Sequence, residues 1–266
     1  MRVVMFNFKQ QRNLIDFQKL LFILPVIFLV KMLSACSAPE KRVALVIGNN
    51  DYQKNDKLVI AADDAKEVKS ALEVAGFDVT YKTDLKRKEL LRVIGDFNDV
   101  AQDADAAVFY YAGHGMQYKA ANYLIPIDAD ITKPKDIEGQ AVPLGNVLLV
   151  ARKKRKRVDI IILDACRDNK FEPEKKGLAE VLPPEETLVA YATSPGKTAK
   201  DNGLYAKAFS ETVKELDGLR VQQIFDRVRQ TIGEQTGSTQ IPLYYTNISG
   251  DFYFVEKKHA KLIFTF

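Results

Sequence analysis

From residue 42 onward, short apolar runs alternate with segments in which apolar residues recur every three or four positions. Continuous apolar runs are typical of strands buried on both faces of a sheet, and the wider spacing is typical of amphipathic helices. The expected strands span residues 42–48, 78–81, 106–111, 158–164, 187–192 and 252–255. The expected helices span about 63–75, 86–100, 144–153, 204–216 and 219–232. This alternation predicts an α/β fold, a three-layer αβα sandwich around a mostly parallel six-stranded sheet.

The first 35 residues follow another pattern. Basic residues precede an apolar run from Leu20 to Val30, and the tetrapeptide Leu33–Cys36 follows it, an order typical of a secretory signal. Eleven helical residues span only about 16 Å, which favours a removable signal over a permanent membrane anchor. The tetrapeptide resembles the lipobox of bacterial lipoproteins, which implies that Cys36 becomes the lipidated N-terminus. The same small residues also suit ordinary cleavage and secretion of a soluble protein.

These features predict four segments along the chain. They are a signal peptide at 1–35, a lipidated terminus with a short linker at 36–41, one α/β domain at 42–256 and a tail at 257–266. Acyl chains on Cys36 would hold the domain on a membrane. Ser37 after that cysteine resembles outer-membrane sorting in double-membrane bacteria, which implies the periplasmic side of the outer membrane.

The formal net charge differs between the whole chain and the chain without its predicted signal. The formal net charge of the chain is +4, but the first 35 residues hold five of its 39 basic and one of its 35 acidic residues. The remainder has 34 of each and is formally neutral, which gives no argument for a nucleic-acid partner. The basic run Arg152–Arg157 is expected at the C-terminal end of a helix, where cations are favoured and solvated.

The chain has two cysteines, so a lipid on Cys36 leaves Cys166 as the single thiol and excludes an internal disulfide. That thiol is either a small buried apolar group or a reactive one. Two expected strands end in polar groups, one in Gly113-His114-Gly115 and the other in Asp164-Ala165-Cys166. If these strands are neighbours, His114 and Cys166 emerge at one edge of the sheet and form a Cys-His dyad.

The chemistry suits that pair, because a thiolate is the nucleophile and a nearby imidazolium lowers the thiol pKa and supplies a proton. The backbone N–H groups of Gly115 and Cys166 are candidates for an oxyanion hole. A hydrogen-bonded turn histidine is the alternative for His114. The second histidine, His259, lies in the Lys-rich tail, so no metal site is expected.

The segments Tyr110–Gly115 and Asp164–Arg167 resemble the histidine and cysteine motifs of caspases, metacaspases and bacterial orthocaspases. Caspases place the histidine about 50 residues before the cysteine, and positions 114 and 166 are 52 apart. The resemblance extends over most of 41–256, with further matching segments at 43–49, 62–65, 191–196 and 250–254. It implies a caspase-like fold and a cysteine endopeptidase that acts on peptides or proteins.

The acidic residue two positions before the cysteine sets the implied specificity. Caspases proper have Gln there, whereas Asp164 matches metacaspases, in which this Asp and one at the start of the first helix line the main specificity pocket. By resemblance these are Asp164 and Asp64, and carboxylates pair with Arg or Lys. Ser194 lies in the segment that, by resemblance, pairs with extended substrate. The alternatives are that Asp64 complements a helix dipole and that Asp164 caps a turn.

Several alternatives stay open. Arg167 and Asp168 stand where metacaspases usually continue with His and Ser, which puts rate and specificity in doubt. Part of the metacaspase group is activated by calcium, for which Asp128, Asp130 and Asp136 offer oxygen ligands, but no EF-hand pattern is present and no cofactor is expected. Self-cleavage at Lys175-Lys176, in the loop 169–186, is a further hypothesis. A non-catalytic peptide-binding scaffold and another thiol enzyme are the competing functions.

Overall fold

The computed structural model describes residues 40–147, 157–166, 178–194, 202–215 and 218–255, and of Cys166 it describes the backbone only. The expected signal peptide, Cys36 and the C-terminal tail lie outside the described residues, as do Arg167, Asp168 and Lys175-Lys176. Among the described residues, no helix is both long and apolar enough to cross a membrane.

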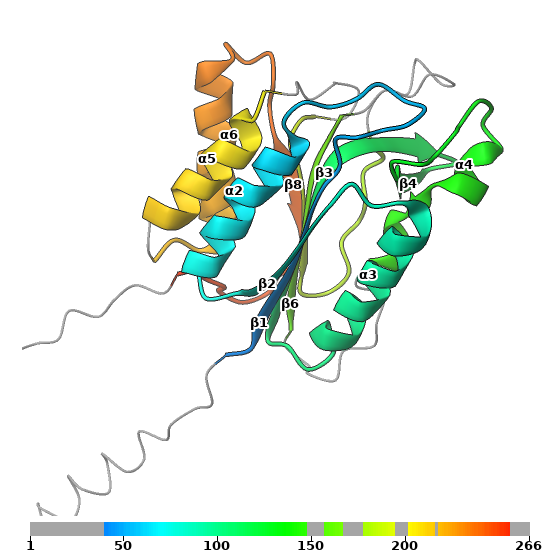
Figure 1. The fold of residues 1–266 in the computed structure, drawn as a ribbon. Coiled ribbons are helices and arrows are strands. Elements are labelled where there is room, and N and C mark those ends of the chain that lie inside the picture. Colours follow the sequence, from blue (N-terminus) through cyan, green and yellow to red (C-terminus); the bar gives the residue numbers. More distant parts are fainter. Residues whose placement is uncertain (1–39, 148–156, 167–177, 195–201, 216–217, 256–266) are drawn as a thin grey trace, which may run out of the picture. The chain divides into compact units, whose positions relative to one another are not determined.

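The central sheet is mostly parallel, as predicted (Figure 1). Its main path runs β2-β1-β3-β6-β7-β8, in which the first five strands pair in parallel and β8 pairs with β7 in antiparallel orientation. The strands of this path are β1 (Arg42–Gly48), β2 (Asp78–Thr83), β3 (Ala106–Tyr118), β6 (Val158–Cys166), β7 (Thr187–Tyr191) and β8 (Leu243–Thr246).

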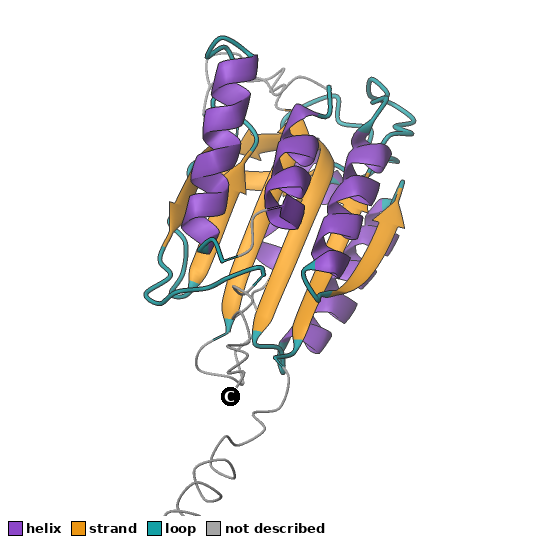
Figure 2. Cartoon of the chain, turned by 90° about the vertical axis from the view of Figure 1, so that its left-hand side faces the viewer, coloured by secondary structure: helices purple, strands orange, loops and turns teal. Residues whose placement is uncertain are grey.

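Helices cover both faces of this sheet. Figure 2 shows the helical layer on one face of the sheet. It consists of α2 (Ala61–Val74), α5 (Leu204–Glu215) and α6 (Val221–Gln235). On the other face lies α3 (Arg87–Ala101), with the short α4 (Asp136–Gln140) and the 3-10 helix η1 (Leu144–Asn146) nearby.

Side chains of the central strands alternate between the two helical layers because successive strand residues point to opposite faces. Val108 and Ile160 belong to the core under α2, α5 and α6, whereas Phe109 and Ile161 belong to the core under α3. This alternation explains the continuous apolar runs in the sequence, since both faces of the central strands are buried.

The predicted strand that ends at Tyr111 continues to Tyr118. The residues after His114 pair with β4 (Ala121–Leu124), and β4 in turn pairs with β5 (Val142–Pro143). The turn between β3 and β4 is Lys119-Ala120, and both residues have positive φ angles, as two-residue hairpin turns require. Neither residue is among the Asn and Gly that usually mark such turns, so no local signal predicts this hairpin.

The predicted last strand, 252–255, is wrong. The last strand of the sheet is β8, and Tyr253 makes only an isolated bridge to Arg220. Phe252 and Phe254 are buried in the core beside the helices, where Phe254 packs edge-on against Phe209. Their apolar spacing reflects burial against helices and not a place in the sheet.

The helix predicted at 144–153 begins as the 3-10 helix η1, and residues 148–156 lie outside the described part. The basic run was expected to be solvated, but its last residue, Arg157, is not. Arg157 is fully buried, and its guanidinium pairs with both carboxylate oxygens of Asp159 and donates to the carbonyl of Ala101. A basic side chain with a buried acidic partner is therefore part of the core at the start of β6.

Candidate active site

β3 and β6 bring His114 and Cys166 together. The two strands are parallel neighbours, and their register places His114 directly opposite Cys166, the last residue of β6. The prediction that these two strands are adjacent is confirmed. Parallel strands in register end at the same edge of the sheet, so both residues lie at the carboxyl edge, where ligands bind in open α/β sheets.

The imidazole of His114 is fixed by the loop after β1. Its Nε2 lies 2.6 Å from the backbone carbonyl oxygen of Asp56, and its ring packs against Tyr52 with 4.3 Å between ring centroids. Because a carbonyl oxygen only accepts hydrogen bonds, Nε2 carries the proton in this contact. In the neutral imidazole Nδ1 is then the free proton acceptor.

Two buried tyrosines hold the backbone of His114. The N–H of His114 donates to the hydroxyl of Tyr52 at 2.7 Å, and the hydroxyl of Tyr111 lies 2.9 Å from the carbonyl oxygens of His114 and Ile125. The two hydroxyls are 3.3 Å apart. Since both carbonyls only accept, the proton of Tyr111 goes to them and Tyr52 donates to Tyr111. Burial, and then the neighbouring Tyr111, hold the pKa of Tyr52 well above its ordinary value, so its hydroxyl stays protonated.

The glycines around His114 make room for this network. A Cβ atom on Gly113 would lie 2.7 Å from the hydroxyl oxygens of both Tyr52 and Tyr111. A Cβ atom on Gly115 would lie 3.3 Å from the Cβ of Ala165, in the neighbouring strand. Gly115 itself pairs with Leu124 of β4. The Gly-His-Gly motif therefore allows close packing on both sides of the histidine.

The two predicted pocket acids lie around one tyrosine of β3. Tyr110 donates from its hydroxyl to Oδ2 of Asp164 at 2.9 Å. Burial raises the pKa of Tyr110 well above its ordinary value, and the charges of Asp164 and then Asp64 raise it further. The neutral Tyr110 hydroxyl thus donates to the carboxylate from β6, and the charge of Asp64, in the first turn of α2, also acts on it. Both Asp side chains are partly exposed to solvent, as an ion-pairing pocket requires.

Successive residues of β3 thus serve the two halves of the site. Tyr110 belongs to the core under α2 and contacts the acidic pair, whereas Tyr111 belongs to the core under α3 and supports the histidine. Because side chains alternate between the two faces of β3, this one strand positions both the acidic pair and the histidine.

Ser194 follows β7 and is partly buried. Its hydroxyl donates to the carbonyl oxygen of Ile241 at 2.8 Å, and the amide of Gln240 donates to the carbonyl of Ala192 at 2.9 Å. The loop that leads to β8 therefore holds the segment after β7. Because the Ser194 hydroxyl is bound to this loop, the backbone of Ser194 is a more direct candidate for substrate pairing than its side chain.

A pocket of about 350 Å³ opens beside the histidine. Its lining comes from the loop after β1 and from β3 with the adjacent chain, namely Lys54, Asn55, Asp56, His114, Gly115, Met116 and Ile125. Its volume falls within the range of small-ligand sites. The pocket can receive part of a substrate that lies across the carboxyl edge of the sheet.

The acids proposed as calcium ligands have structural partners. The carboxylate of Asp128 accepts the N–H of Arg87, and that of Asp136 accepts the N–H groups of Thr132 and Lys133. The backbone of Asp130 is bound by the side chain of Gln140. Among the described residues, no group of three or more His, Cys, Asp or Glu side chains could hold a metal ion.

Sequence reasoning missed Tyr52 and Asp56. Tyr52 follows Gly48 by four residues in a polar loop, and nothing local indicates that it contacts a residue 62 positions later. Asp56 contributes its backbone carbonyl, which any residue has, so no side-chain signal exists. Only the folded loop reveals these two contacts.

A family model of the caspase domain matches residues 41–253. The human mucosa-associated lymphoid tissue lymphoma translocation protein 1 is 25% identical over 203 residues, which are 73% of this chain and 24% of that protein. Its mouse homologue matches to the same extent. A probable protease of a Desulfuromonadales bacterium is 29% identical over 139 residues, 47% of this chain and 16% of that protein. The chain thus spans a quarter or less of the length of the curated relatives it matches.

Proposed function

The chain belongs to the caspase-domain family of cysteine peptidases, and we propose that it is an endopeptidase with a Cys166–His114 dyad that cleaves after Arg or Lys. One observation carries this proposal. The register of β3 and β6 places His114 opposite Cys166, and the contact between Nε2 and the Asp56 carbonyl leaves Nδ1 as the proton acceptor.

In the first step Nδ1 of His114 takes the proton of the Cys166 thiol, and the thiolate attacks the carbonyl carbon of the scissile peptide. The carbonyl π electrons move to oxygen, and backbone N–H groups of Gly115 and Cys166 stabilise that oxyanion. When the intermediate collapses, the C–N bond breaks and His114 gives its proton to the leaving amine. A thioester between Cys166 and the substrate acyl group remains.

In the second step a water molecule gives a proton to Nδ1 of His114 and attacks the thioester carbonyl. The C–S bond breaks, the acid product leaves, and the proton returns to the Cys166 sulfur. Asp56 supports both steps because its carbonyl accepts the Nε2 proton and so leaves Nδ1 as the atom that takes up and gives back the proton. The tyrosine pair keeps the backbone of His114 in one position throughout.

The acidic pair supports the basic specificity. Asp164 accepts a hydrogen bond from the Tyr110 hydroxyl, and the charges of Asp164 and Asp64 both act on that hydroxyl. A guanidinium or ammonium group entering between two carboxylates would gain charge-assisted hydrogen bonds. The carboxylate of an Asp side chain on the substrate would instead meet like charge.

The test is the hydrolysis of matched fluorogenic peptides that end in Arg, Lys or Asp, with and without calcium. The purified protein is compared with Cys166→Ala, Asp164→Asn and the control Asp63→Asn, whose exposed side chain lies one residue before Asp64. We expect cleavage after Arg or Lys that is lost in Cys166→Ala and falls at least about tenfold in kcat/KM in Asp164→Asn. Asp63→Asn should match the wild type.

Cleavage after Asp would contradict the acidic pocket, and cleavage that survives Cys166→Ala would contradict the dyad. No hydrolysis by a protein shown to be folded, with peptide binding retained after thiol alkylation, would instead support the scaffold function. Product analysis separates hydrolysis from acyl transfer, since only hydrolysis releases a free acid.

A further inference from the structure

The strand β2 forms the outer edge of the sheet. It pairs with β1 along Asp78–Thr83, and it is the terminal strand on its side of the sheet among the described residues. Its residues alternate between exposed and half-buried. It contains no proline, and its Val, Thr and Tyr residues favour strand structure. A regular edge strand of this kind presents backbone N–H and C=O groups to any strand that approaches.

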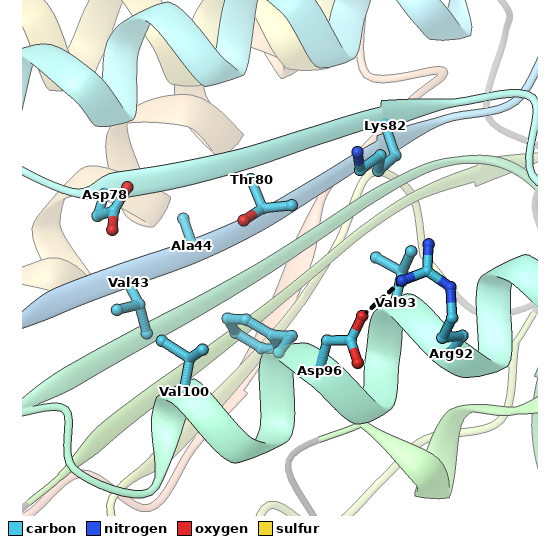
Figure 3. A pocket seen from close by; sticks show the side chains of 10 residues that line it. Val43, Ala44, Asp78, Thr80, Lys82, Arg92, Val93, Asp96 and Val100 are labelled. Carbon is cyan, nitrogen blue, oxygen red and sulfur yellow. Dashed lines mark hydrogen bonds and ion pairs between the residues drawn. The ribbon is translucent and has the colours of Figure 1, made fainter.

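Figure 3 shows the groove beside this edge, which has a volume of about 300 Å³. The β2 side is formed by Asp78, Thr80 and Lys82, all exposed to solvent. The α3 side includes the charged pair Arg92–Asp96 and Val100, which is 48% exposed. None of the proposed active-site residues lines this groove. Here α3 packs against β1, and within the described part of the chain the β2 side chains of this face stay exposed.

The charges on β2 are arranged symmetrically about its middle. Asp78 and Lys82 lie two residues on either side of Thr80 and project to the same face of the sheet. In an antiparallel pair, residues directly opposite each other share a face, and opposite charges there stabilise the pair. Two copies of β2 paired about Thr80 would place Asp78 of each opposite Lys82 of the other. On the other face, Val79 would lie opposite Tyr81.

Other registers lose this match. Pairing about Val79 would place Asp78 opposite Thr80, and pairing about Tyr81 would place it opposite Asp84. Registers centred between two residues are excluded because opposite residues would then point to different faces. The charges of β2 therefore favour one antiparallel register, and the partner with the matching charges is a second copy of the same strand.

We propose that β2 is a dimerisation edge, at which two copies of this chain pair antiparallel about Thr80 and join their sheets into one. The two-fold axis passes midway between the two copies of Thr80, and the interface is isologous, as in most homodimers. The grooves of the two copies would lie on the same face of the joined sheet and flank the new strand pair. This inference is independent of the proposed peptidase activity, because the groove contains none of the residues assigned to it.

Charge reversal tests this register. The variant Asp78→Lys would place Lys opposite Lys twice, and Lys82→Asp would place Asp opposite Asp twice. We expect each single variant to self-associate about tenfold or more weakly than the wild type at low ionic strength. Mixing the two single variants restores both opposite-charge pairs, and so does the double variant D78K/K82D. Both should therefore dimerise as the wild type does.

The measurement is sedimentation equilibrium of the purified protein, with Lys66→Asp on α2 as the matched charge change outside the interface. Because the exchanged side chains are exposed, circular dichroism should show unchanged folding. A monomeric wild type would overturn the proposal, and so would single variants that dimerise normally or a mixture that does not associate. Single variants that dimerise normally would show that Asp78 and Lys82 do not form the contact. A mixture that does not associate would show that these charges only keep the edge strand soluble.

A cysteine cross-link gives a second test. Opposed Cα atoms in antiparallel pairs are about 4.5–5.5 Å apart, which lies within the range that a disulfide bridges. Thr80→Cys, in a chain with both native cysteines replaced, should form a covalent dimer under mild oxidation. Thr83→Cys, which would face Phe77 in this register, should not. Cross-linking of Thr83→Cys but not of Thr80→Cys would contradict the register.

Discussion

β3 and β2 are both parallel neighbours of β1, yet they differ in almost every physical respect. β3 is buried along most of its length, and its buried tyrosine hydroxyls and His114 have partners inside the protein. β2 is half-exposed from end to end and has charged side chains near both of its ends. The same sheet therefore produces two kinds of surface, one suited to chemistry and one suited to association.

β3 and β2 differ because water reaches polar groups at the edge of the sheet but not in its centre. In the centre a polar group must find its partner inside the protein, as the two tyrosines and the backbone of His114 do. At the edge of the sheet water hydrates a charged side chain, so the charge needs no partner inside the protein. Matched changes in the two regions should therefore have very different costs.

The largest contrast concerns two ion pairs. Asp159 lies at the start of β6 beside β3 and pairs with the fully buried Arg157, whereas Asp96 pairs with Arg92 on the exposed side of α3. Asp159→Asn would leave a buried guanidinium without its counter-charge and should lower the free energy of unfolding by about 3–5 kcal/mol. Asp96→Asn should lower it by less than about 0.5 kcal/mol. Urea denaturation of both variants measures the difference.

An equal loss in the two variants would contradict this distinction between centre and edge. Asp159 also accepts from Arg157 through two oxygens. The double change of Arg157 and Asp159 to apolar residues should therefore recover much of the stability that Asp159→Asn alone loses, since the stranded charge is then absent.

A second contrast concerns two tyrosines. Tyr52→Phe would remove the acceptor of the His114 N–H in a buried site and should cost about 1–3 kcal/mol of stability. Tyr81 on β2 donates to the carbonyl of Ala62 from a half-buried position, so Tyr81→Phe should cost less than about 1 kcal/mol. Denaturation of both variants gives these values.

Peptide hydrolysis sharpens this contrast. Tyr52→Phe should lower kcat more than it raises KM, because it loosens the histidine and leaves the acidic pair intact. Tyr81→Phe should leave both constants unchanged. A Tyr52→Phe variant with normal stability and normal kcat would mean that the tyrosine pair does not position His114.

The smallest contrast concerns two glycines. Gly95 is exposed within α3, and a Cβ atom there meets nothing within 4 Å, so Gly95→Ala should stabilise the protein by about 0.5–1 kcal/mol. Gly113→Ala should instead destabilise it, since the added atom would press on two buried hydroxyls. Thermal unfolding of the two variants should shift in opposite directions. A stabilising Gly113→Ala would show that the tyrosine pair has room to move.

Local patterns predicted most of the elements and failed where the contacts are distant. The buried strands 42–48 and 158–164 were found within two residues of their ends, because burial on both faces leaves a continuous apolar run. β8 was missed because its mostly half-buried residues show no alternation of apolar and polar positions. Phe252 and Phe254 have the apolar spacing of a strand, but they pack against helices. The extension of β3 depended on pairing with β4, which no local signal marked.

The sequence by itself determined the α/β class and the family and singled out Cys166 and His114 as the candidate pair, because periodicity, motif and spacing are properties of the chain alone. The tertiary structure decided which groups surround that pair. It placed the Asp56 carbonyl on His114 and Asp164 on the Tyr110 hydroxyl, and among the described residues it left β2 at the edge of the sheet. These contacts join residues dozens of positions apart, and they depend on strand order and register, which the whole fold fixes through burial and backbone pairing.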